Sequence, residues 1–182
     1  MRLVRNSEIA EDPYLRPPDD DPLPDEGAVL VSADRLLADA DAITKHKGAA
    51  GVLWPNDRAV SELAPHLDRL ALIALSFPSF RDGRAYSQAR ILRERYGFRG
   101  ELRATGQILR DQFLFLLRSG FDAFEVTKDT DVAAFADSVR RYSVFYQPGA
   151  DGSPPAFRRR LAPPDVPCAT TCDWERSVKA KF

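Results

Sequence analysis

Arginine dominates the part of the sequence that is richest in residues able to do chemistry. Residues 81–118 contain nine arginines, no lysine and four acidic residues, a net charge of +5. A planar guanidinium can donate two parallel hydrogen bonds to a carboxylate or an oxyanion. The whole chain has 21 arginines and five lysines, so part of the bias is general. The segment predicts either an anion-binding rim or a helix face of ion pairs such as Arg90 with Glu94.

The first candidate anion site follows the apolar run Ala71–Phe77, where a helix is expected to begin. Free backbone amides and the helix dipole favour anions at such a place, and side chains of Arg84 and Ser87 would add donors. The structural alternative is that Asp82 only caps the helix and Gly83 only forms the turn. The candidate residues in this segment are Asp82, Gly83, Arg84, Tyr86, Ser87 and Arg90.

A second group of candidates lies in and after the next expected strand. Charged side chains in a strand are costly unless they pair or face water. Glu101 and Arg103 therefore either pair with each other or across strands, or contact a ligand. The turn after this strand adds Gly106, Arg110 and Asp111 as candidates. In an enzyme, the acid or base would be Asp82, Glu101 or Asp111, and Arg84, Arg90 and Arg103 would hold an anionic substrate.

Residues for metal or nucleophile chemistry are few. The histidines are His46, in a charged KHK segment, and His66, on an amphipathic stretch where we expect it to be packed. Cys168 and Cys172 have C-x3-C spacing, and two thiolates need further ligands to hold zinc or a cluster. The sequence has no GxGxxG, P-loop or HExxH motif. We therefore expect no metal site and no bound cofactor, and the sequence assigns no catalytic residue.

Four strand–helix units must position the candidate residues. Alternation at this spacing predicts a parallel sheet with right-handed crossovers. Pro65 is expected to end or kink the second helix. The expected strands are Ala50–Trp54, Ala71–Phe77, Glu101–Thr105 and Asp122–Val126, and the expected helices begin near Asp34, Asn56, Asp82–Arg84, Gln107 and Asp131.

Polar side chains on one face of the third strand leave two architectures open. Glu101, Arg103 and Thr105 share a face, and Ser76 and Glu125 in the neighbouring strands can join it. Strands of an open sheet that is covered on both faces are almost wholly apolar. The pattern fits a TIM-like half-barrel with a polar lumen, or a small flavodoxin-like open sheet in which this strand is at the edge.

The composition divides the chain into three parts. Residues 1–27 have three arginines, eight acids and five prolines, which predicts an extended, mostly loose acidic arm with a short strand at Arg2–Arg5. Residues 28–147 form the single α/β domain, beginning with a strand at Ala28–Val31. Residues 148–182 are rich in proline, glycine and charge, and we expect a flexible tail with a short helix near Trp174.

Charge and hydropathy exclude several classes. The net charge of -1 argues against a nucleic-acid-binding protein. The longest apolar run, about Leu70–Phe77, is far shorter than the roughly 20 residues of a membrane span. Two cysteines exclude a disulfide scaffold, and we expect a cytoplasmic protein. A homodimer would cover the open edges of a half-barrel.

The segment Phe77–Phe124 resembles a bacterial family of unknown function whose members are typically encoded beside sulfite reductase and other sulfate-assimilation genes. Gly51-Val52, Trp54-Pro55 and Tyr142–Gln147 match the flanks more loosely. The matching residues are Phe77-Pro78, Phe80, Asp82-Gly83-Arg84, Tyr86-Ser87, Ala89-Arg90, Leu92–Gly97, Gly100–Ala104, Gly106, Arg110-Asp111 and Gly120–Phe124.

The family is often labelled a probable oxidoreductase involved in sulfite reduction, and this label follows gene neighbourhood. The resemblance implies an accessory protein of assimilatory sulfite or sulfate reduction, which binds the reductase, another sulfate-assimilation protein or an oxyanion at the arginine-rich rim. The alternatives are a small barrel-like enzyme acting on a phosphorylated or carboxylated metabolite, and a non-catalytic adaptor domain.

Overall fold

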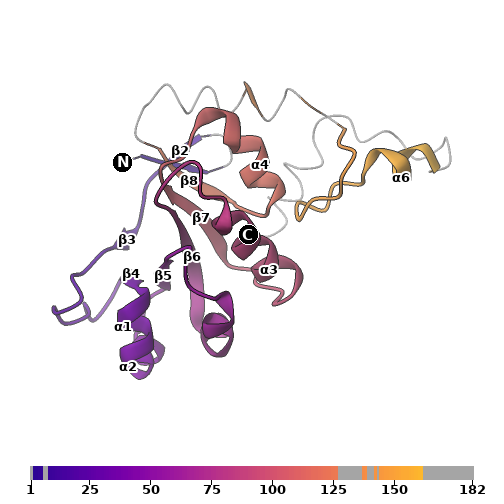
Figure 1. Cartoon of the computed structure of the whole chain (residues 1–182). Coiled ribbons are helices and arrows are strands. Elements are labelled where there is room, and N and C mark those ends of the chain that lie inside the picture. Colours follow the sequence, from indigo (N-terminus) through magenta and orange to yellow (C-terminus); the bar gives the residue numbers. More distant parts are fainter. Residues whose placement is uncertain (1, 6–7, 127–136, 139–141, 143, 162–182) are drawn as a thin grey trace.

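The protein forms one mixed eight-stranded sheet flanked by short helices (Figure 1). The computed structural model describes residues 2–5, 8–126, 137–138, 142 and 144–161. Along the sheet the strand order is β2-β1-β8-β7-β6-β5-β4-β3. The strands are β1 Arg2–Arg5, β2 Glu8–Ala10, β3 Tyr14–Leu15, β4 Ala28–Ser32, β5 Ala50–Trp54, β6 Leu70–Phe77, β7 Glu101–Gly106 and β8 Ala123–Val126.

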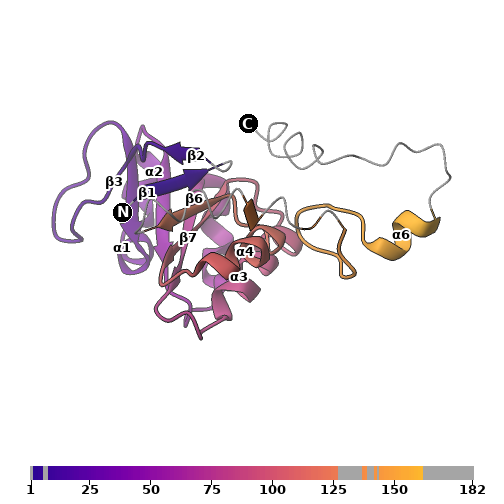
Figure 2. The ribbon, with the colours of Figure 1, turned by 90° about the horizontal axis from the view of Figure 1, so that it is seen from above.

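The strand order confirms the half-barrel. Strands β3 to β8 pair in sequence order and all in parallel. In a flavodoxin-like sheet, by contrast, the order of the strands reverses at a switch point. The two edge strands β2 and β3 are separated by only three residues, Glu11–Pro13. An extended chain of that length spans at most about 14 Å, so the sheet must curl until its edges approach each other. Figure 2 shows this curled sheet from above.

The helices follow the expected strands but are shorter than the sequence pattern suggests. Asp39 splits the first helix because its side chain accepts a hydrogen bond from Ala42 N and starts a new helix. Pro65 lies within a 3-10 helix instead of an α-helix, and the helix expected from Gln107 begins at Arg110. The helical elements are α1 Ala33–Ala38, α2 Ala40–Lys45, η1 Val60–Arg69, α3 Arg84–Glu94, η2 Arg110–Gln112, α4 Phe113–Arg118 and α6 Ala156–Leu161.

The two faces of the sheet differ in chemistry because side chains alternate along each strand. The outer face forms the main hydrophobic core under the helices, and the inner face forms the lumen of the half-barrel. Apolar lumen residues cluster around Leu30, Leu72 and Ala74. The outer core includes Val31, Val52, Ile73, Leu102 and Phe124 from the strands and Leu36, Leu92 and Leu116 from the helices.

The acidic arm is part of the sheet. The strand expected at Arg2–Arg5 is present as β1, which pairs antiparallel with β8. We expected extended backbone in the rest of the arm, but not the pairing of β2 with β1 and of β3 with β4. These pairings occur because the curled sheet leaves two edges that the arm can join, so three segments of the arm belong to the sheet.

The part of the chain that follows β8 is only partly described. The helix expected after Asp131 and the helix expected near Trp174 lie largely or wholly outside the described residues, as do Cys168 and Cys172. Residues 144–161 contact the domain through Arg118, whose guanidinium carbon is 3.9 Å from the centre of the Phe145 ring. Helix α6 extends away from the sheet, on the side opposite α1 and α2 (Figures 1 and 2).

Candidate functional site

Arg103 is at the centre of a charged network in the lumen. The residue is completely buried on the inner face of β7. Its Nε donates to Glu101 Oε1 at 2.9 Å, and its Nη1 lies 2.8 Å from Asp12 Oδ2 and 3.4 Å from Glu125 Oε1. Burial disfavours the charged guanidinium, but the hydrogen bonds and charges of Asp12 and Glu101 raise the pKa of Arg103 above its ordinary value. Of the alternatives left open by the sequence, Arg103 pairs both with Glu101 and across strands with Glu125, and these pairs face the lumen.

The acids of this network have further partners. Glu101 also forms an ion pair with Arg5 from β1, and Glu125 on β8 forms one with Arg16. The Thr105 hydroxyl donates to Glu125 Oε2 at 2.7 Å. The polar face of the third expected strand, β7, therefore points into the lumen. Ion pairs and hydrogen bonds of the buried acids connect strands β7, β8 and β1 there.

The residues that complete the network come from the acidic arm and were missed in the sequence. We call residues 11–16 the strap, because they cross from β2 to β3 over the polar side of the lumen. Asp12, Tyr14 and Arg16 alternate along the strap and all contact lumen residues. The Tyr14 ring lies 5.4 Å from the guanidinium carbon of Arg103, and burial followed by the charge of Glu101 raises the pKa of Tyr14. The polar and aromatic side chains at every second residue, 12, 14 and 16, are typical of a strand, and this was the signal available in the sequence.

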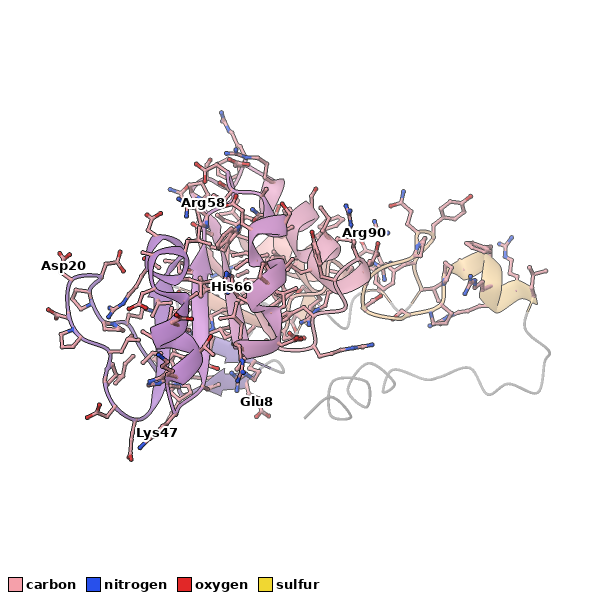
Figure 3. All side chains as sticks on the ribbon, turned by 90° about the horizontal axis from the view of Figure 1, so that it is seen from below. Glu8, Asp20, Lys47, Arg58, His66 and Arg90 are labelled. Atoms are coloured by element: carbon pink, nitrogen blue, oxygen red, sulfur yellow. The ribbon has the colours of Figure 1, made fainter. Side chains whose placement is uncertain are left out.

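The candidate anion site at the start of α3 is occupied by an internal ion pair. Arg84 Nη2 lies 2.7 Å from Asp82 Oδ2, and the hydrogen bonds from Arg84 hold the pKa of the Asp82 carboxyl well below its usual range. Asp82 is not the cap of α3 as the structural alternative had it, because Gly83 takes the N-cap position without a side-chain cap hydrogen bond; Ser87 is exposed. Arg90 Nε donates to Glu94 Oε1 at 2.8 Å on the outer surface (Figure 3). The Arg90–Glu94 pair is the ion pair expected on the helix face, and Arg84 also pairs with a carboxylate.

The remaining candidates support the loops at the carboxyl ends of β6 and β7. Tyr86 packs edge-on against Phe77, and burial together with the charge of Asp111 raises the pKa of Tyr86 to about 12. Gly106 has φ +99°, and a Cβ there would lie 2.4 Å from the carbonyl oxygen of Phe77. Arg110 is exposed at the start of η2. Arg103 and Glu101 are therefore together in the lumen, while Asp82, Arg84 and Arg90 lie on the outside.

A hollow of about 360 Å³ lies at the carboxyl ends of β4, β5 and β6. Ligands of parallel α/β sheets bind at this end of the strands. Arg58 contributes its side chain and is tied to Asp34 by an Nη2–Oδ1 contact of 2.6 Å. Figure 3 shows Arg58 on the outer surface, away from the arm loop that carries Asp20. The hollow is lined by Ser32, Ala33, Asp34, Leu53, Pro55, Asp57, Arg58 and Ser76.

A second surface feature lies on the loops that follow β6 and β7. We call Phe80, Arg81 and Leu109 the rim patch. Phe80 and Leu109 are both 43% exposed, and the guanidinium carbon of Arg81 lies 5.4 Å from the Phe80 ring centre. Gln112 holds the two loops together, because its Nε2 donates to Phe80 O at 3.1 Å and its Oε1 accepts from Leu109 N at 3.0 Å. The patch is a fixed apolar surface with an arginine on it.

Two further observations concern metals and membranes. Within the described residues, no group of three or more His, Cys, Asp or Glu side chains could hold a metal ion. His46 has a ring nitrogen 2.8 Å from the Gly27 carbonyl oxygen, and His66 lies on η1 half-buried (Figure 3). Among the described helices, none has the length and apolar character needed to cross a bilayer.

The fold and these sites define an α/β half-barrel whose lumen is closed by its own N-terminal strap. Residues 51–157 match the family model described as "Bacterial protein of unknown function (DUF934)", and the chain belongs to this family. The matched residues include strands β5 and β6 beside the hollow, the rim patch and Arg103, whereas the strap precedes the match. No curated protein and no solved structure matches the chain.

Proposed function

We propose that this chain is a cytoplasmic accessory protein of assimilatory sulfite or sulfate reduction that binds the reductase through the rim patch. The pathway comes from the family resemblance of Phe77–Phe124, and the exposed rim patch supports binding of a protein partner. The observation that carries the proposal is the exposure of Phe80 and Leu109 on two loops that Gln112 holds in place. In protein interfaces, most of the binding energy comes from a few aromatic and arginine side chains that become buried when the partner binds.

The charge around the rim patch selects the kind of partner surface. Arg81 lies over the Phe80 ring and forms no ion pair among the described residues, so its positive charge is available to a partner. A complementary surface therefore presents acidic groups around an apolar pocket. The candidate anion-binding arginines Arg84 and Arg90 already have carboxylate partners, so the rim suits a protein surface better than a free oxyanion.

Binding of purified assimilatory sulfite reductase from the same bacterium to the immobilised full chain tests the proposal. Phe80→Ser should weaken binding at least tenfold, which is the effect of losing one interface hot spot. Phe157→Ser is the matched control, because Phe157 is 48% exposed on α6, away from the sheet. Equal affinities of the wild-type chain and both variants, or no binding by any of them, would contradict the proposal.

A second candidate function is small-molecule binding or turnover in the hollow. The observation that favours it is the volume of about 360 Å³ at the carboxyl ends of three parallel strands, within the range of ligand sites. Ser32 and Ser76 would contribute hydroxyl groups and Arg58 a cation to a phosphorylated or carboxylated metabolite. A thermal-shift screen of such metabolites tests it: stabilisation that is lost in Ser76→Leu supports the candidate, and no stabilisation by any metabolite contradicts it.

A further inference from the structure

The buried arginine of the lumen has an unused hydrogen-bond donor. Arg103 is completely buried, yet its Nη2 has no hydrogen-bond partner. Buried polar groups of native proteins are nearly always paired, so a buried guanidinium nitrogen without an acceptor indicates a place for one. The adjacent nitrogen Nη1 contacts Asp12, which belongs to the strap and whose side chain is 30% exposed.

We propose that Arg103 forms a lumen site for a small oxyanion or carboxylate, and that Asp12 occupies this site as an internal ligand. The site is separate from the rim patch and stands or falls independently of the proposed reductase binding. The ligand class follows from the chemistry of guanidinium, which binds a group with two oxygen acceptors in a bidentate manner. Asp12 satisfies only half of that geometry, because its Oδ1 instead accepts a hydrogen bond from the backbone nitrogen of Tyr14 at 3.2 Å.

The balance of charge gives Asp12 this role among the three acids of the network. Arg5, Arg16 and Arg103 face Asp12, Glu101 and Glu125, so the network as described is neutral. Glu101 and Glu125 lie on sheet strands, where Arg5 holds the first and Thr105 with Arg16 holds the second. Asp12 has Arg103 at 2.8 Å and, as a further partner, only the more distant Arg16, with Nη2 3.9 Å from its Oδ2. Asp12 is the acid that lies outside the strands. Its removal leaves a net charge of +1 in the lumen, which a bound anion neutralises.

The strap would uncover the site by a local movement. Asp12 and Tyr14 together cover the guanidinium of Arg103, the first by a 2.8 Å contact and the second by its ring at 5.4 Å. Residues 14 and 15 are the whole of β3, an edge strand with two register partners, so few backbone hydrogen bonds hold this end of the strap. Displacement of Asp12 by an external anion would expose Arg103 without breaking the central strands β5 to β8.

Asp12→Ala provides the test, with sodium sulfite, sodium sulfate and sodium formate as probes. We expect calorimetry to show at least tenfold tighter binding of a probe to Asp12→Ala than to the wild-type chain, with a rise in Tm absent in sodium chloride of equal ionic strength. Asp20→Ala is the matched control on the same arm, since Asp20 lies exposed at the far end of its loop (Figure 3). Asp12→Ala/Arg103→Met should lose the binding.

A second measurement uses the wild-type chain and does not depend on folding of the variants. Saturating sulfite should increase deuterium uptake in residues 11–16, because the anion displaces Asp12 and frees the strap. No tighter binding by Asp12→Ala, or tighter binding that persists in the double variant, would overturn the proposal. If Asp12→Ala does not fold, unchanged deuterium uptake of the wild-type strap in sulfite overturns it instead.

Discussion

Replacement of Arg103 by methionine should destabilise the domain far more than replacement of an exposed arginine. The variant keeps a long apolar side chain in the lumen but removes the cation shared by Glu101, Asp12 and Glu125. Breaking a buried ion pair by removing one partner typically costs about 3–5 kcal/mol, because the remaining charge stays buried without compensation. The structure therefore predicts a large loss from a single side chain.

The lower end of that range applies here. Glu101 retains its ion pair with Arg5, and Glu125 retains Arg16 and the Thr105 hydroxyl, so only part of the compensation disappears. We expect a loss of about 3 kcal/mol in the free energy of unfolding. For a chain of this size, each kcal/mol lowers Tm by about 2–4 °C, so Tm should fall by about 6–12 °C.

Thermal and urea unfolding followed by circular dichroism measure this loss. Arg90→Met is the matched control, because Arg90 is exposed and its i,i+4 pair with Glu94 is expected to contribute only about 0.3–0.5 kcal/mol. Both variants lose one arginine, so general effects of net charge cancel. If Arg103→Met were no less stable than Arg90→Met, the buried charge network would not hold the half-barrel together.

Three further predictions concern the outer rim. The pKa of Tyr86, raised to about 12, predicts that the difference in tyrosinate absorbance between the wild-type chain and Tyr86→Phe develops near pH 12; a difference complete at pH 10 would contradict its burial. Because Arg84 lowers the pKa of Asp82, this pair stabilises the fold above the ordinary carboxyl pKa of about 4, and the stabilisation is lost as the pH falls below that value. The difference in urea midpoint between the wild-type chain and Asp82→Asn should therefore narrow from pH 7 to pH 3. A difference that stays constant would count against the pair. Gly106→Ala should lose more than the approximately 1 kcal/mol expected for Gly97→Ala, because both have positive φ but only residue 106 also meets a backbone oxygen; equal urea midpoints would contradict this.

The sequence was sufficient to predict the parallel strands and the class of fold. Apolar runs such as Leu70–Phe77 fit buried parallel strands. The polar face of β7 fitted both a half-barrel lumen and the edge strand of an open sheet, and only the strand order selected the half-barrel. Helix lengths were less predictable, because local caps and breaks decided them. Asp39 and Pro65 interrupt helices that hydrophobic periodicity alone would have continued.

The site was predictable only in part, because pairing in the lumen is a property of the closed fold. The sequence offered a Glu101–Arg103 pair as one of the alternatives for these two strand residues, and the pair is present. It gave no direct sign that Asp12, about 90 residues earlier in the chain, would reach Arg103, since this contact depends on the curl that brings both sheet edges together. The hollow was also missed, because its residues come from the ends of three strands.

The arginine-rich segment shows why composition overestimates anion binding. Arg84, Arg90 and Arg93 each have a nearby carboxylate, from Asp82, Glu94 and Asp122. Two of these acids are within four residues of their partners and were visible in the sequence. A count of arginines treats each of them as a potential ligand site, whereas the folded chain uses these pairs to fix helix and loop ends.

Hydrogen–deuterium exchange of the full chain with and without purified assimilatory sulfite reductase would show directly whether the rim patch is the docking surface. We expect the reductase to slow exchange in residues 78–83 and 107–111, the two loops that carry the rim patch. Uptake in α6 should stay unchanged, because this helix lies away from the sheet. Unchanged exchange in both loops at saturating reductase would contradict the claim that the rim patch is the docking surface.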